Sequence, residues 1–253
     1  MAANPKRADR PVPWLLMVLA LIAFAALVAL GSWQLQRLQW KDGLIATIQQ
    51  RVTSPPSSVD AIDAQFRRGG DVDYWPVEVR GTFVNGAERH FFATYEGRSG
   101  FYIYTPLRLP YGRFVFVNRG FVPYELKEPA SRPASAIEGE VTVKGLSRNP
   151  LDGKPSYLVP DNDPAKNIFY WKDLDVMAAT AGLPRRATVL PFFIDADATP
   201  NPGGLPIGGV TIIDLPNNHL QYALTWYGLA AALVAVVFLW LYGRRKPRDA
   251  AMP

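Results

Sequence analysis

Two long apolar stretches, one near each end of the chain, constrain the fold more than any other feature. No charged residue lies between Pro13 and Gln36, and none lies between Leu220 and Gly243. A helix rises about 1.5 Å per residue, so each stretch is long enough to cross the roughly 30 Å hydrocarbon core of a membrane. The 253-residue chain is therefore predicted to have two spans. About 180 residues remain between them, which is enough for one extramembrane domain.

The net charge of +5 comes from the two ends of the chain. The tails hold seven of the 27 basic and two of the 22 acidic residues, so 20 of each sign lie between Arg37 and His219. A neutral domain has no long-range field to attract a polyanion, which argues against nucleic-acid binding. Basic residues that flank membrane spans usually lie in the cytoplasm, so both termini are predicted to be cytoplasmic and the central domain external.

The chain is thus divided into five predicted segments. They are a cytoplasmic tail at 1–12, a transmembrane helix at 13–36, a periplasmic domain at 37–218, a second transmembrane helix at 219–243 and a cytoplasmic tail at 244–253. A cleaved signal peptide is the alternative for the first helix. Its apolar run is longer than a usual signal h-region, and its one Ala-x-Ala match lies in mid-run. We therefore interpret it as a retained anchor.

The central domain has the pattern of a β-rich fold. The first span is predicted to continue outward as an amphipathic helix that ends before Pro55. One further helix is predicted at 173–181, with Gly182 as its stop. Alternating or aromatic-rich runs predict strands at 75–84, 90–95, 102–109, 113–118, 141–146 and 188–194. Short strands with few helices indicate a mainly antiparallel α+β domain, of a kind that can close into a barrel.

Two glycines inside strand patterns, Gly81 and Gly120, are predicted to be structural. Such a glycine usually marks a bulge or a close approach of another backbone segment. A branched side chain at either position is expected to cost on the order of 1–3 kcal/mol.

Small residues four apart can let membrane helices pack closely. Ala25 with Ala29, and Gly228 with Ala232, are the pairs that predict such packing.

The chain has few residues that could perform catalysis. It has no cysteine, which excludes thiolate metal sites, cysteine nucleophiles and covalent c-type haem attachment. Of its two histidines, His90 lies in an aromatic strand pattern and is interpreted as a structural or surface residue. No spacing typical of a metal site or catalytic triad is present. The sequence therefore predicts a protein that is not an enzyme.

His219 stands out because it lies at the outer end of the second span. An ionisable residue at such a position is a functional candidate by default. Tyr222 and Trp226 follow at +3 and +7, so one helix face could accept a flat ring beneath the imidazole. The alternative is that His219 caps the helix behind Asn217 and Asn218, with the aromatic residues forming an interfacial belt. Periodicity alone favours the capping interpretation.

Seven segments, in order along the chain, resemble the surfeit locus protein 1 family of assembly factors for haem-copper cytochrome c oxidases. The first and last of these segments are the most specific. The segments are GSWQLQRLQWK (31–41), YWPVEVRGTF (74–83), YTPLRL (104–109), VNRGFVP (117–123), VKGLSR (143–148), FYWKDLDVMA (169–178) and PNNHLQYALTWYGLA (216–230).

The resemblance implies a function as well as a topology. It implies a bacterial inner-membrane protein that binds haem a as cargo and assists maturation of oxidase subunit I. Expected partners are subunit I, other assembly factors such as haem a synthase, and the lipid bilayer. By the same resemblance His219 is the expected axial ligand of the haem iron. From their positions on the helices, Trp226 and Tyr222 are expected to border the ring. Arg37 and Lys41 are candidates to pair with the propionates, and the alternative is that both are solvated interfacial charges.

Two other classes of function remain open at this stage. One is a scaffold that stabilises an oxidase subunit during assembly without binding haem. The other is an outward-facing binding module or membrane-tethered enzyme unrelated to respiration, which the missing catalytic set disfavours. Stoichiometric haem in the purified protein would separate the first from the haem-binding hypothesis.

Overall fold

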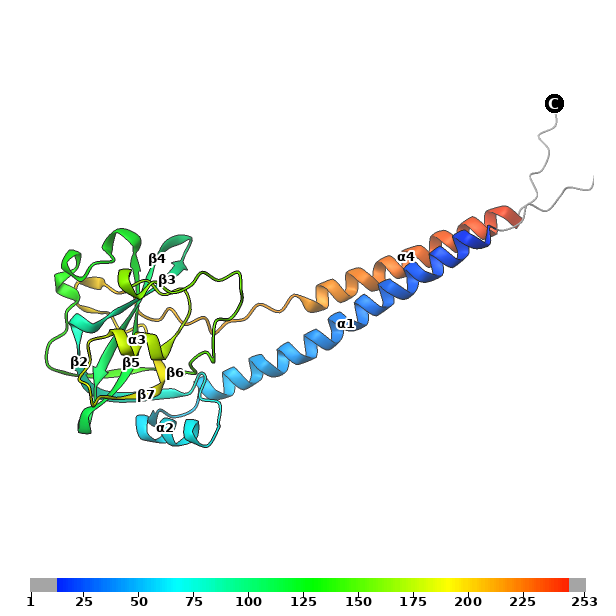
Figure 1. The fold of residues 1–253 in the computed structure, drawn as a ribbon. Coiled ribbons are helices and arrows are strands. Elements are labelled where there is room, and N and C mark those ends of the chain that lie inside the picture. The colour runs from blue at the N-terminus through cyan, green and yellow to red at the C-terminus, as the bar shows by residue number, and fades with distance from the viewer. Residues whose placement is uncertain (1–12, 246–253) are drawn as a thin grey trace, which may run out of the picture. The chain divides into compact units, whose positions relative to one another are not determined.

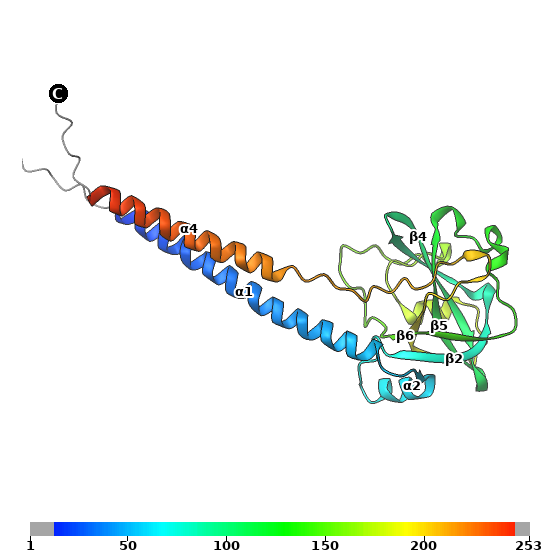
Figure 2. The ribbon, with the colours of Figure 1, turned by 180° about the vertical axis from the view of Figure 1, so that it is seen from behind.

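The computed structural model describes residues 13–245, which form two compact units. The first unit combines the chain up to Ala46 with the chain from Asp214 onward, and we call it the helix pair. The second is Thr47–Ile213, which we call the β-domain. Helices α1 (Trp14–Val52) and α4 (His219–Arg245) lie side by side in both views (Figures 1 and 2).

Both long helices have the properties of membrane spans. Each is long and apolar enough to cross a bilayer, and only 6% of each apolar window is buried within the protein. A helix that is apolar on all sides and not covered by protein is stable only in lipid. As predicted, α1 continues past its apolar run and ends at Val52, shortly before the proline pair. The predicted tails at 1–12 and 246–253 lie outside the described residues.

One seven-stranded sheet accounts for the strands of the described chain. In the order β1-β2-β6-β7-β5-β4-β3 neighbouring strands are paired, and β2 also pairs with β4 through Thr82–Arg108 and Phe83–Leu107. These pairings form a closed circuit through β2, β6, β7, β5 and β4, so the domain is barrel-like. The strands are β1 (Ser57–Ser58), β2 (Pro76–Phe83), β3 (Arg89–Tyr95), β4 (Arg98–Arg108), β5 (Arg113–Pro123), β6 (Glu140–Arg148) and β7 (Thr188–Ala196).

The predicted fold class is confirmed, with one refinement of strand direction. Most pairings are antiparallel, but β5 runs parallel to β7 and β1 runs parallel to β2. After its first residue, β5 is buried along its whole length. The predicted strand ended at Asn118 because Asn118, Arg119 and Gly120 interrupt the apolar run, but these three residues are buried and β5 continues through them to Pro123.

Two helices cover the sheet. Helix α3 (Leu174–Thr180) occupies the predicted position, begins at Asp173, whose carboxylate accepts the amide of Val176 at 3.1 Å, and packs Met177 into a cluster with strand residues. Helix α2 (Val59–Arg67) was not predicted. It begins at Ser58, whose hydroxyl accepts the amide of Ala61 at 3.2 Å, and buries Ile62 in the main core. A capping serine before an amphipathic turn was the sequence signal for α2.

Both predicted structural glycines lie against another backbone segment. At Gly81, a Cβ atom would come within 2.5 Å of the carbonyl oxygen of Arg108. Gly120 has φ +123°, and a Cβ there would meet the carbonyl of Ile207. The interpretation of these two glycines as sites of close backbone approach is therefore confirmed.

Candidate functional site

The two long helices approach closely through small residues on one face of α4. Ala223 and Ala230 are 1% and 3% exposed. On α1, Gly31 lies against Tyr227, because a Cβ at that glycine would be 2.9 Å from the tyrosine ring. The predicted small pairs, Ala25 with Ala29 and Gly228 with Ala232, are wrong, since all four residues are exposed. In helices rich in alanine and glycine, spacing alone could not identify which small residues face the partner helix.

A hydrogen bond fixes the contact at Gly31. Ser32 donates its hydroxyl to the carbonyl of Val28 at 2.9 Å, and its oxygen lies 3.0 Å from the hydroxyl of Tyr227. Since the serine proton is already used, Tyr227 is the donor in the second bond. This pair ties the two helices together about two turns inward from His219.

His219 is joined to α1 by its imidazole ring. Its Nδ1 atom lies 2.7 Å from Oε1 of Gln34, a residue only 9% exposed. An amide oxygen can only accept, so Nδ1 carries the hydrogen in this bond. A neutral ring then has its lone pair on Nε2, which makes no hydrogen bond to any residue between 13 and 245. The geometry leaves His219 with one oriented nitrogen that can bind a metal.

In the structure the side chain of His219 does not cap helix α4. Helix α4 begins at His219, and the backbone carbonyl of Asn218 accepts the amide of Tyr222 at 3.3 Å. Asn217 accepts the amide of His219 at 3.4 Å through its side-chain oxygen. The two asparagines thus accept hydrogen bonds from two backbone amides in the first turn of the helix, while the imidazole bonds to Gln34.

Further polar contacts hold the loop before α4 to α1. Lys41 donates to the carbonyl of Pro216, and the side-chain amide of Asn217 donates to Asp42 at 2.8 Å. On α1 these bonds lie about two turns beyond Gln34, and on the other segment they lie two or three residues before His219. The ring of His219 is therefore held on an anchored segment and not on a loose helix end.

No hydrogen bond or ring contact within residues 13–245 joins His219 to the predicted site residues Tyr222, Trp226 and Arg37. Tyr222 is 55% exposed, and Trp226 is half-buried. Arg37 follows Gln34 by about one helical turn, and its guanidinium carbon lies 4.4 Å above the ring of Trp40. Sequence reasoning missed Gln34 because a glutamine near a membrane interface reads as a solvated residue, and only the helix pairing brings it to His219.

No multidentate metal site accompanies this histidine. Among the residues the structure describes, no group of three or more histidine, aspartate or glutamate side chains could hold a metal ion. A metal that is held within a macrocycle, as in haem, needs only an axial ligand from the protein, and a single imidazole can supply that ligand.

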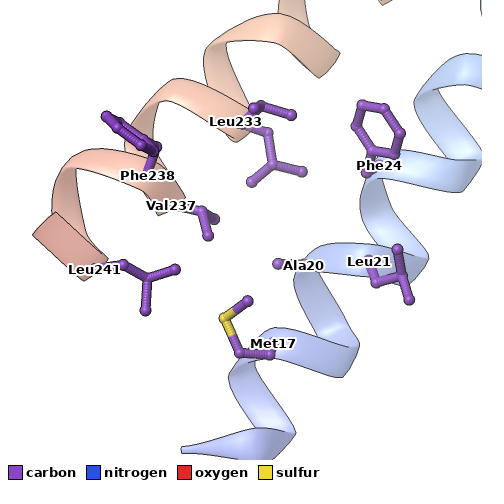
Figure 3. A pocket seen from close by; sticks show the side chains of 9 residues that line it. Met17, Ala20, Leu21, Phe24, Leu233, Val237, Phe238 and Leu241 are labelled. Atoms are coloured by element: carbon purple, nitrogen blue, oxygen red, sulfur yellow. The ribbon is translucent and has the colours of Figure 1, made fainter. Parts of the chain in front are cut away.

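Deeper along the helix pair is a groove of about 300 Å³, in which Met17, Ala20 and Phe24 of α1 face Leu233 and Val237 of α4 (Figure 3). None of its nine lining residues carries a charged or hydroxyl side chain. This groove can take apolar groups such as lipid chains, and it offers no charged partner for a polar ligand.

The β-domain contains a second group of polar side chains, centred on Glu88. Its carboxylate oxygen Oε1 lies 2.7 Å from Nε2 of His90 and also accepts from Arg132. All three residues are at most 5% exposed. His90 is therefore a buried structural histidine, as one of its two predicted roles required. Burial by itself raises the pKa of Glu88, but His90 and Arg132 outweigh it and hold the pKa below the ordinary 4.5.

This network predicts acid sensitivity of the β-domain. A carboxyl group with a depressed folded-state pKa contributes stability that is present above its unfolded pKa and is lost as the pH falls through the folded value. We expect the thermal midpoint of the protein to fall as the pH drops below about 4.5. Glu88→Gln should cost about 3–5 kcal/mol at pH 7, because it leaves Arg132 buried without its anion, and should remove part of the acid-dependent loss.

Asp161→Asn is the matched control for this test. Asp161 pairs with Lys154 at 2.6 Å, but its side chain is 91% exposed. An exposed pair contributes little, so this variant should unfold like the parent at both pH values. Equal stability of Glu88→Gln and Asp161→Asn at pH 7 would show that the buried network is not stabilising.

Comparison with known proteins covers both structural units. The sequence pattern of the SURF1 family matches residues 21–231. Surfeit locus protein 1 of Rattus norvegicus is 36% identical over 264 aligned residues, covering 97% of this chain and 80% of the relative. The Homo sapiens protein of the same name is 35% identical over 94% of this chain and 79% of its own length. The SURF1-like protein of Drosophila melanogaster is 29% identical over 94% of this chain. The chain therefore belongs to the SURF1 family.

Proposed function

We propose that this protein is an assembly factor for haem-copper cytochrome c oxidase that binds haem a and assists its insertion into subunit I. The observation that carries the proposal is the bond between His219 and Gln34, which uses Nδ1 and leaves Nε2 of the imidazole without a hydrogen bond to any residue between 13 and 245. Family membership supports the role in oxidase assembly. The protein acts as a binding protein and not as a catalyst.

Each residue of the proposed site has a distinct task. His219 supplies the axial nitrogen, and Gln34 keeps the proton on Nδ1. Trp226 and Tyr222 border one edge of the ring from α4. Arg37 offers exposed N–H donors for a propionate, whereas Lys41 already donates to a carbonyl. A single protein ligand leaves the other face of the iron open for transfer, which suits cargo.

The test of this function is the visible spectrum of the full-length protein purified in mild detergent from cells that make haem a. We expect about one haem a per chain together with co-purifying oxidase subunit I. Co-purifying oxidase subunits without haem would favour the scaffold alternative. The absence of both haem and oxidase subunits would contradict the haem-binding and the scaffold hypotheses.

We also propose that the protein lies in the bacterial inner membrane with both termini in the cytoplasm and the β-domain in the periplasm. The basic tails support this orientation. Because the chain has no cysteine, single cysteines can replace Ser57, Ser131 and Ala251, the last of which lies outside the described residues. In intact spheroplasts an impermeant thiol reagent should label positions 57 and 131 only. Labelling at 251 alone would reverse the orientation.

A further inference from the structure

The β-domain has an open pocket that is lined by none of the residues assigned to haem in the sequence. Its volume is about 400 Å³, within the usual range for small-molecule sites. Strands β2, β5, β6 and β7 all contribute to its lining. Apolar walls come from Phe83, Ile137, Val141 and Ala196, and the charged group at its inner end is Arg119.

Arg119 is a buried cation with no carboxylate partner. It is 2% exposed, and no acidic oxygen of the described chain lies within 4.0 Å of its guanidinium. Its Nη2 donates to two neutral acceptors, the carbonyl of Ser135 at 2.7 Å and the side-chain oxygen of Asn201 at 3.0 Å. Its Nε is buried without a partner, and the guanidinium carbon lies 4.8 Å from the centre of the Phe83 ring. Burial lowers the pKa of Arg119 to about 10.

The surrounding side chains do not supply the missing negative charge. Glu88 is the carboxylate that acts electrostatically on Arg119, but it is already bonded to His90 and Arg132. Arg89, also buried, donates to the backbone carbonyls of Glu88 and Thr180. Three buried arginines thus share one glutamate, and an uncompensated charge in a low-dielectric interior is costly. An anion entering the pocket would remove that cost.

We propose that this pocket binds a small organic carboxylate with a compact apolar body. The carboxylate accepts from Arg119, and the apolar body lies against the walls formed by Phe83, Val141 and their neighbours. Lys144 adds positive charge at the rim, where its nitrogen lies 3.8 Å from Glu78 and its side chain is 62% exposed. Asp197, also on the rim, disfavours a second negative group, so the site selects monoanions. This site is independent of His219 and of haem.

The probe for this site is 4-fluorobenzoate, compared with the uncharged 4-fluorobenzamide. The full-length protein is placed in nanodiscs, with empty nanodiscs as the blank, and binding is followed by fluorine NMR of the ligand. We expect saturable binding of the benzoate and about tenfold weaker binding of the amide, because hydrogen bonds to a charged group are worth more. Equal binding of the two probes, or no binding of the benzoate, would overturn the proposal.

Two variants locate the bound probe. Arg119→Met should abolish the preference for the carboxylate, but this arginine also holds Ser135 and Asn201 and its loss could unfold the domain. Thr142→Trp is the second variant, because Thr142 is exposed, lines the pocket and makes no side-chain bond to be lost. Its indole should fill the pocket and abolish binding. Glu140→Trp, two residues earlier on the same strand and outside the pocket, should bind like the parent. Undiminished binding by Thr142→Trp would overturn the assignment.

Discussion

Replacing His219 with alanine is expected to remove bound haem a while leaving the amount of membrane-inserted protein unchanged. The imidazole is the proposed axial ligand, and alanine has no atom that can replace Nε2. The helix pair should survive, since Ala223, Ala230 and the Tyr227 to Ser32 bond still join α4 to α1. The measurement is haem per purified chain from the visible spectrum, with protein quantified by immunoblot of membranes.

Gln221→Ala is the matched control for the loss of haem. Gln221 is exposed on the same turn of α4, and only its backbone carbonyl makes a described hydrogen bond, to Thr225. This variant should retain haem. Gln34→Leu should give an intermediate result, about 10- to 100-fold weaker binding, because it removes the group that orients the ligand. Wild-type occupancy and an unaltered spectrum in His219→Ala would reject the ligand assignment and leave the scaffold alternative.

Gly120→Val is expected to destabilise the β-domain strongly. The backbone conformation at φ +123° is strained for any L side chain, and a Cβ would overlap the carbonyl of Ile207. Ile207 cannot move away easily, because it exchanges two backbone hydrogen bonds with Phe121, at 2.8 and 2.9 Å. Strain and overpacking together are expected to cost on the order of 4 kcal/mol.

The stability of Gly120→Val is measured by thermal unfolding and protease resistance, and two other glycine substitutions serve as comparisons. Gly81→Val should cost about 1–3 kcal/mol, because its φ is ordinary and only the close approach of Arg108 and Leu107 opposes a side chain. Gly86→Val should be nearly neutral, since nothing lies within 4 Å of the added atom. If Gly120→Val is as stable as Gly86→Val, the close approach of Ile207 does not constrain this position.

Much of the fold was predictable because its signals are local. Uninterrupted apolar stretches identified both long helices, and alternating residues identified β2, β6 and β7 within a few residues of their ends. Helix α3 followed from its apolar face and from the glycine that ends it. The parallel pairing of β5 with β7 was not predictable, because Arg113 pairs with Thr188 and nothing local specifies a partner 75 residues away.

The candidate site was predictable only in part, for the same physical reason. His219 could be singled out from its position at the end of a span. Its partner Gln34 could not, because the bond depends on how two distant helices face each other. The cluster of Glu88, Arg119 and Arg132 likewise forms only when separate strands and loops meet. In the sequence alone, these charged residues cannot be distinguished from ordinary surface residues.

Under the proposed function, the bond between Gln34 and His219 would make haem binding a late event in biosynthesis. It joins residues 185 positions apart, so the imidazole is oriented only after the last helix has left the ribosome and paired with the first. Under the proposed function, an unfinished chain that has already folded its β-domain still lacks an oriented ligand. Truncated translation products would then be unable to bind haem a, and only chains that contain both helices would carry it.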